Sequence, residues 1–169
     1  MNFKNRLIIL ENKETLKFDD FIFKCSIGKE GTTSNKFEGD KKTPKGLFHL
    51  GQLFYRKDRV QKPLSRLKTV AIKKNMVWCD DSTDKKNYNR LLKKKIKTKH
   101  EKIFRKDNTY DYLIPILYNT KLRTPGKGSA IFIHLTKNYK KTAGCITLIK
   151  KDFLILVKLI NKNTKIKII

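Results

Sequence analysis

The chain has 169 residues, of which 38% are hydrophobic and 33% are charged, and its formal net charge at pH 7 is +26. These values predict a single globular domain, residues 1–169, that is long enough to bury a hydrophobic core, and no apolar run approaches the roughly 18 residues of a membrane-spanning helix. Only seven of the 41 basic residues are arginine, so lysines spread over a solvated surface explain much of the charge, and a nucleic-acid partner is not the favoured interpretation.

The first half of the chain predicts β-structure. A polar turn separates the first two expected strands, which makes them a hairpin, and the third ends at Gly28. Residues 28–46 are rich in glycine and contain Pro44, so they predict a long surface loop. The expected strands of this half are residues 6–10, 15–18, 21–28 and 47–56.

The second half begins with a long irregular middle, residues 57–109, in which we expect one short helix near residues 98–106. Near the end, Phe153, Leu156, Val157 and Ile160 lie on one face of a predicted helix, residues 151–162. The remaining expected strands are residues 112–119, 129–135 and 164–169. The predicted fold class is mostly β, a sandwich or barrel-like domain with one late helix and a long irregular insertion.

The cysteines and histidines do not form a metal-binding pattern. Cys25, Cys79 and Cys145 are an odd number and have no CxxC spacing, which argues against a disulfide framework and against a structural zinc site. The three histidines are not spaced for ligation either, so we expect no metal and no cofactor. Cys25 and Cys79 are interpreted as small buried residues, with a resolving thiol as the alternative for Cys79.

One cysteine and one histidine could act together in catalysis. His134 lies near the end of an apolar strand, and Cys145 follows Gly144 eleven residues after the histidine. A nucleophilic thiol needs a nearby base, and a glycine before it allows close approach of substrate to backbone N–H groups. From spacing alone, a structural role for both residues stays open.

Several motifs, in order, resemble one family. "EGDKKTPKGLFHL" (residues 38–50) is similar to the "GDxxTPxGxF" stretch of the YkuD-type L,D-transpeptidases, cysteine enzymes that cross-link peptidoglycan. "IFIHL" and "TAGCITL" (131–135 and 142–148) resemble the catalytic motif of that family. "VWCDDSTDKKNYNR" and "KHEKIFRKDNTYDYLIPILYN" (77–90 and 99–119) resemble one branch of it. The resemblance covers about residues 20–150.

The resemblance implies a role for each catalytic residue. Cys145 would be the acylated nucleophile, and His134 would be the base that takes its proton. The carbonyl of Leu135 would orient the imidazole in place of a carboxylate, and the N–H groups of Gly144 and Cys145 would form the oxyanion hole. The chain departs from the family at Ala143, where most members have histidine, and at Thr147, where arginine is usual.

The resemblance also suggests substrate contacts. Trp78 is expected to form a wall of the cleft, with a buried tryptophan as the alternative. The remaining expected contacts are Tyr88 and Asn89, which could recognise stem-peptide amides, Tyr118 and Asn119 at the end of a strand, and Thr142 and Ala143 beside the nucleophile. Asp80, Asp81, His100 and Glu101 are interpreted as structural or exposed.

The leading hypothesis is a peptidoglycan L,D-transpeptidase whose partners are stem peptides. A cysteine carboxypeptidase or endopeptidase on the same peptides, and a basic module that binds nucleic acid or another anionic polymer, are the alternatives. The family implies a location in the cell envelope. The apolar run at residues 7–10 is too short for a signal peptide, so we expect none in this chain, and a cytoplasmic location, a removed leader and another export route stay open.

Overall fold

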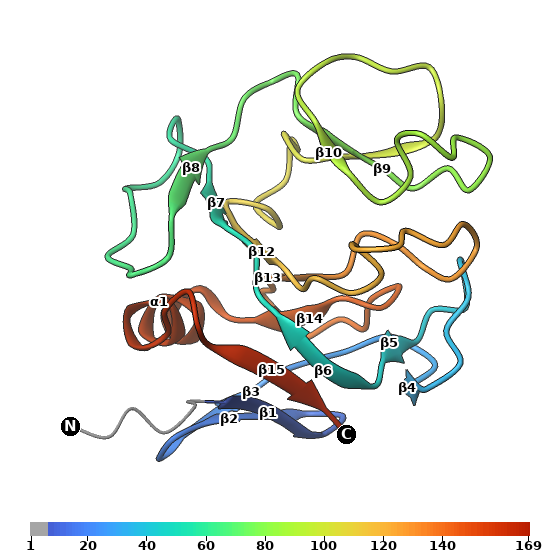
Figure 1. The fold of residues 1–169 in the computed structure, drawn as a ribbon. Coiled ribbons are helices and arrows are strands. Elements are labelled where there is room, and N and C mark those ends of the chain that lie inside the picture. The colour runs from blue at the N-terminus through green and yellow to red at the C-terminus, as the bar shows by residue number, and fades with distance from the viewer. Residues whose placement is uncertain (1–6) are drawn as a thin grey trace.

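The computed structural model describes residues 7–169 (Figure 1). Arg6, the first residue of the first expected strand, lies outside this range. Two five-stranded sheets form the body of the domain. In the first, the strands are β1 (Leu7–Asn12), β2 (Thr15–Phe18), β3 (Phe21–Lys24), β6 (Gly46–His49) and β15 (Lys165–Ile168), in the order β3-β2-β1-β15-β6.

The second sheet carries the residues of the candidate site. Its strands are β7 (Leu53–Tyr55), β8 (Thr69–Ala71), β12 (Tyr112–Pro115), β13 (Phe132–Leu135) and β14 (Ile146–Leu148), in the order β14-β13-β12-β7-β8. The helix α1 (Lys150–Leu159) follows β14 directly. The smaller sheets are β10-β9-β11, with β9 (Val77–Cys79), β10 (Leu91–Leu92) and β11 (His100–Lys102), and the pair β4 (Thr32–Thr33) and β5 (Thr43–Pro44).

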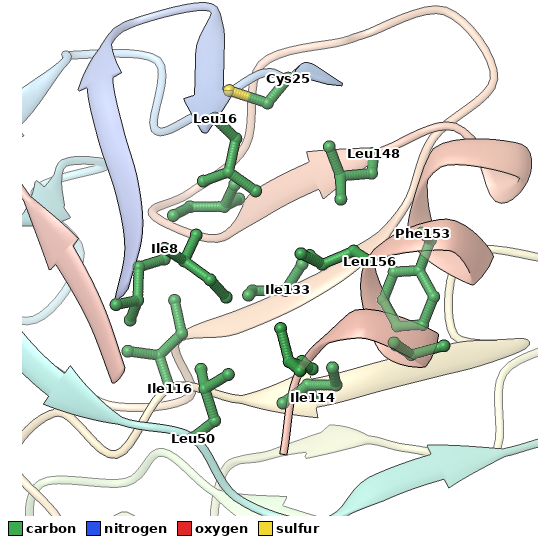
Figure 2. Close-up of a cluster of buried hydrophobic side chains, with 14 of the residues drawn as sticks. Ile8, Leu16, Cys25, Leu50, Ile114, Ile116, Ile133, Leu148, Phe153 and Leu156 are labelled. Atoms are coloured by element: carbon green, nitrogen blue, oxygen red, sulfur yellow. The ribbon is translucent and has the colours of Figure 1, made fainter. Parts of the chain in front are cut away.

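The main hydrophobic core lies between the two large sheets and against α1 (Figure 2). Ile8 and Leu16 reach it from the first sheet, and Ile114 and Ile133 from the second, all with 0% exposure. Phe153 of α1 is also fully buried and stacks on Tyr112, with ring centroids 5.9 Å apart. The late helix therefore closes one side of this core with its apolar face.

The other face of the second sheet is covered by the segment between β8 and β12. A second apolar cluster forms there, in which Phe132 of β13 packs with Trp78 and Tyr110 of that segment. Neighbouring residues of a strand point to opposite faces. Ile133 and Leu135 therefore enter the main core, while Phe132 and His134 face the second cluster.

The prediction of a mostly β fold with one late helix is confirmed, and the sheets are not closed into a barrel. The strand around His134, β13, lies in the interior of its sheet, between β12 and β14. The expected strand at residues 47–56 is two strands. Leu50 and Gly51 carry the chain from the first sheet to the second, where the Gly51 N–H donates to Pro115 O at 2.8 Å.

The short helix expected near residues 98–106 is wrong. Residues His100–Lys102 form β11, which pairs antiparallel with β9. Their backbone groups are satisfied by that neighbouring strand, and the Ile103 N–H donates to Met76 O at 3.2 Å. A tertiary partner that is distant in the sequence therefore overrides the local pattern.

Between residues 7 and 169, none of the helices has the length and apolar character that crossing a membrane would require.

Replacing Phe153 with alanine tests the closing role of α1. We expect F153A to lower the free energy of unfolding by about 3–5 kcal/mol, because a buried aromatic ring leaves a cavity. Lys158→Ala, at an exposed position of the same helix, should change it by less than about 0.5 kcal/mol. Urea unfolding measures both, and equal losses in the two variants would contradict this account of the core.

Candidate active site

His134 and Cys145 lie on the same face of the second sheet because β13 and β14 are parallel neighbours. In this ladder Ile133 pairs with Ile146, and His134 pairs with Thr147. Paired residues of adjacent strands point to the same face of a sheet, and Cys145 immediately precedes β14. Cys145 packs against the second apolar cluster, so His134, Thr147 and Cys145 lie on one face.

His134 is buried and neutral. Its Nδ1 lies 3.0 Å from the backbone oxygen of Leu135. A carbonyl can only accept, so Nδ1 donates and carries the proton, which leaves Nε2 as the basic nitrogen. Burial lowers the pKa of His134 to about 4, and the edge of the ring packs against Tyr110, with centroids 5.2 Å apart. At pH 7 this imidazole is therefore a proton acceptor.

The thiol of Cys145 is half-buried and uncharged. Sγ donates to Ala130 O at 3.4 Å and accepts from the Phe132 N–H at 3.3 Å. Burial raises the pKa of Cys145 to about 12, and the negative charge of Glu101 adds to this, whereas the Phe132 N–H and the Lys36 ammonium oppose it. Both hydrogen bonds go to backbone at the beginning of β13. The resting pair therefore consists of a thiol and a neutral imidazole.

The turn before Cys145 is held by Thr142. Its Oγ1 accepts from the Gly144 N–H at 3.0 Å and donates to Cys145 O at 2.6 Å. Gly144 has φ +142°, and a Cβ there would lie 2.8 Å from Lys42 O, so only glycine fits. The Gly144 N–H, expected to bind an oxyanion, is engaged within the turn in this state. Ala143 is exposed.

The loop at residues 28–46 is attached to this turn. Thr43 Oγ1 donates to Gly144 O at 2.8 Å and accepts from the Gly28 N–H at 2.9 Å. The Lys29 N–H donates to Thr142 O at 2.8 Å. The sequence predicted a surface loop here. Its hydrogen bonds to the turn before Cys145 depend on partners about 100 residues away, which no local pattern reveals.

A buried ion pair in the same loop lies beside Gly144. Lys36 Nζ is 2.6 Å from Asp40 Oδ1, and the two side chains are 4% and 1% exposed. Asp40 also accepts from the Lys42 N–H at 2.9 Å. The stem of Lys36 crosses Gly128, and its ammonium lies 3.6 Å from the position of a Cβ on Gly144. The positive end of the pair thus lies beside the turn that precedes Cys145. No pattern in the sequence singles out Lys36.

Three of the expected substrate contacts are internal to the domain. Trp78 is 7%, Tyr88 0% and Asn89 3% exposed. The Trp78 Nε1–H donates to Asn89 Oδ1 at 2.9 Å, and Tyr88 OH donates to Glu38 at 2.6 Å. Asn89 Nδ2 donates to Tyr118 O at 3.0 Å. These side chains connect the segment after β8 to the rest of the molecule.

The next two expected contacts hold the loop between β12 and β13. Asn119 Nδ2 donates to Thr124 O at 2.9 Å and to Gly128 O at 3.0 Å. Tyr118 OH donates to Lys127 O at 2.5 Å, and its ring meets the edge of Phe48. These bonds give Tyr118 and Asn119 a clear structural role.

A cavity of about 650 Å³ opens beside His134. Its walls come from parts of residues 107–111 and 134–142, together with Thr147 and Lys150. Leu135 and Thr142 line it. Cys145 and Ala143 do not, and neither do the other expected substrate contacts, Trp78, Tyr88, Asn89, Tyr118 and Asn119. Among the expected substrate contacts, the structure brings only Thr142 to this cavity.

Glu101 is placed closer to the site than the sequence analysis expected. It forms an ion pair with Arg105 at 2.9 Å, and its charge raises the pKa of both Cys145 and Tyr110. His100 Nδ1 instead lies 2.7 Å from Thr98 O. In the part of the chain that the structure describes, no group of three or more acidic, histidine or cysteine side chains could hold a metal ion.

The fold and the site define a mostly β domain with a cysteine and a histidine on adjacent parallel strands. The model of one protein family, the YkuD L,D-transpeptidase catalytic domain, matches residues 2–168. The chain therefore belongs to the YkuD L,D-transpeptidase family.

Two solved structures are among those that the chain is similar to. The helical cell shape determining protein Pgp2 of Campylobacter jejuni is 18% identical, with a TM-score of 0.47, over 96% of this chain and 46% of that one. L,D-transpeptidase 1 of Mycobacterium tuberculosis is 12% identical, with a TM-score of 0.41, over 96% of this chain and 59% of that one. The chain thus spans about half the length of these proteins. A search of curated proteins gave no match.

Removing the Lys36 ammonium tests the buried ion pair. We expect Lys36→Met to lower the free energy of unfolding by about 3–5 kcal/mol, because it leaves the Asp40 carboxylate buried without its partner. The matched control is Lys17→Met, which breaks the exposed pair with Glu11 (2.7 Å) and should cost less than about 1 kcal/mol. Urea unfolding of both variants measures these changes. Similar small losses of unfolding free energy in the two variants would show that the buried Asp40 carboxylate does not depend on the Lys36 ammonium.

The burial of His134 predicts an acid-sensitive stability. The native state keeps this ring neutral down to about pH 4, whereas the unfolded chain binds its proton near pH 6.5, so stability falls as the pH drops through that window. The contribution of His134 to that loss is about 3 kcal/mol. The free energy of unfolding of the wild type and of His134→Gln, measured from pH 7 to pH 4, should converge by this amount. Parallel curves would contradict a neutral buried ring.

Proposed function

We propose that the chain is a peptidoglycan L,D-transpeptidase in which Cys145 is the nucleophile and His134 is the base. One observation carries the proposal: a neutral imidazole, with Nδ1 bonded to Leu135 O at 3.0 Å, lies on the same sheet face as a half-buried thiol that immediately precedes the next strand. Membership of the YkuD family supports acyl transfer on stem peptides as the reaction.

The first half of the reaction forms a thioester. The Cys145 thiol gives its proton to His134 Nε2 while sulfur attacks the carbonyl carbon before the terminal D-amino acid of a stem tetrapeptide. On this proposal the N–H of Cys145 donates to the resulting oxyanion. When the C–N bond breaks, the His134 imidazolium protonates the leaving amine, and the D-amino acid departs.

The second half transfers the acyl group. An amine of a second stem peptide attacks the thioester carbon, and His134 Nε2 takes a proton from that amine. The C–S bond then breaks, and the proton returns to the Cys145 sulfur. If water takes the place of the amine, the same steps give a shortened stem peptide, which is the carboxypeptidase alternative.

Proton transfer must accompany the attack. With a pKa of about 12 for the thiol, roughly one molecule in 10⁵ holds a thiolate at pH 7. The thiol is bonded to Ala130 O at rest, so it has to turn away from that carbonyl to reach His134. On this proposal the substrate, by entering the site, drives that rotation and the proton transfer together.

Mass spectrometry of a purified disaccharide-tetrapeptide tests the proposal. We expect the wild type to give a cross-linked dimer that lacks one terminal D-amino acid, because acylation expels that residue. Cys145→Ala should give no product, while Cys79→Ala, which removes a buried thiol outside the site, should keep the activity.

Three outcomes would change this conclusion. A monomer shortened by one residue would make the protein a carboxypeptidase with the same nucleophile. Product from Cys145→Ala would exclude Cys145 as the nucleophile. No product from a folded wild type would count against the proposed function.

A further inference from the structure

The cavity beside His134 carries positive charge that no described carboxylate neutralises. Lys137, Lys140, Lys141 and Lys150 line it, and within residues 7–169 none of the four is in an ion pair. They are all exposed, so their ammonium groups can reach a ligand without losing an internal partner.

The acidic residues of the same cavity are already paired. Asp107 accepts from Arg105, with Nη2 and Oδ2 2.6 Å apart. Asp111 accepts from Asn108 Nδ2 at 2.9 Å and lies 3.4 Å from Arg59 Nη1. The net field in the cavity therefore comes from the lysines, and concave protein walls concentrate such a field.

The beginning of α1 adds to this field. Lys150 is its first residue and lines the cavity. The N-cap residue is Ile149, which provides no side-chain hydrogen bond to the first turn. The N-terminal end of a helix carries a partial positive charge, which acts in the same direction as the four ammonium groups, and Asp152 in the first turn offsets part of it.

The cavity also touches the proposed base, His134. His134 and Thr142 are in its lining, and Thr142 Oγ1 is bonded to Cys145 O at 2.6 Å. A volume of about 650 Å³ lies within the range of ligand pockets, about 300–1,000 Å³. A short peptide in this space would lie against the base and next to the nucleophile's turn.

We propose that this cavity selects acidic stem peptides, those whose carboxylates are free, over peptides in which the carboxylates are amidated. This inference rests on the proposed function, since it names the substrate class of the same site. Lysine ammonium groups attract carboxylates as point charges. A neutral amide in the same position gains none of that attraction.

The test compares a disaccharide-tetrapeptide that has free carboxylates with its amidated form. We expect the wild type to favour the free form by about tenfold in kcat/KM. The triple variant Lys137→Gln, Lys140→Gln, Lys141→Gln should lose this preference, because its kcat/KM should fall for the free form and stay unchanged for the amidated form. The matched control is Lys93→Gln, Lys94→Gln, Lys95→Gln, which removes the same charge at exposed positions outside the cavity and should keep the preference.

The outcomes separate this inference from the proposed function. Equal rates with both peptides in the wild type, or an equal loss of preference in the two triple variants, would overturn the inference and leave the transpeptidase intact. If neither peptide is turned over, calorimetry with Cys145→Ala decides. Tighter binding of the free form that depends on the three cavity lysines supports the inference, and no such difference overturns it.

Discussion

The parallel pairing of β13 with β14 is the constraint on which the site depends. It sets His134 beside Thr147 and places Cys145 on the same face of the sheet. Parallel neighbours require a connection that leaves the sheet and returns, and here that connection is the short segment of residues 136–145. The segment has to turn tightly, which Gly144 allows at φ +142°. A register shift of one residue would move His134 into the hydrophobic core.

Burial gives this site its chemical state. The same apolar surroundings lower the pKa of His134 and raise that of Cys145, because an apolar environment disfavours the charged form of each group. Lys36 and the Phe132 N–H oppose the effect on the thiol but do not reverse it. The resting site therefore holds two neutral partners. It differs from cysteine sites in which a thiolate is stored beside an imidazolium. On the proposed function, the energy of substrate binding has to supply the activation.

The sequence predicted what local patterns encode and missed what depends on distant partners. The apolar pattern of the strands predicted the β-structure, and the helical spacing of Phe153, Leu156 and Val157 predicted the helix. The motifs around His134 and Cys145 indicated the family. Nothing near Lys36 indicates that its ammonium lies beside Gly144, because that contact joins segments more than 100 residues apart. The role of Asn89 could not be predicted from the sequence for the same reason. Its side chain is buried by partners in two other segments, so a residue type common in binding loops is structural here.

The central claim is that Cys145 is a neutral thiol until substrate enters. The most direct measurement is the rate at which iodoacetamide alkylates Cys145 in the free protein between pH 4 and pH 10, with Cys145→Ala as the blank for Cys25 and Cys79. The account predicts a rate that keeps rising beyond pH 9 and reaches no plateau at lower pH. A plateau of fast alkylation between pH 5 and pH 8 would reveal a stored thiolate and would contradict the account.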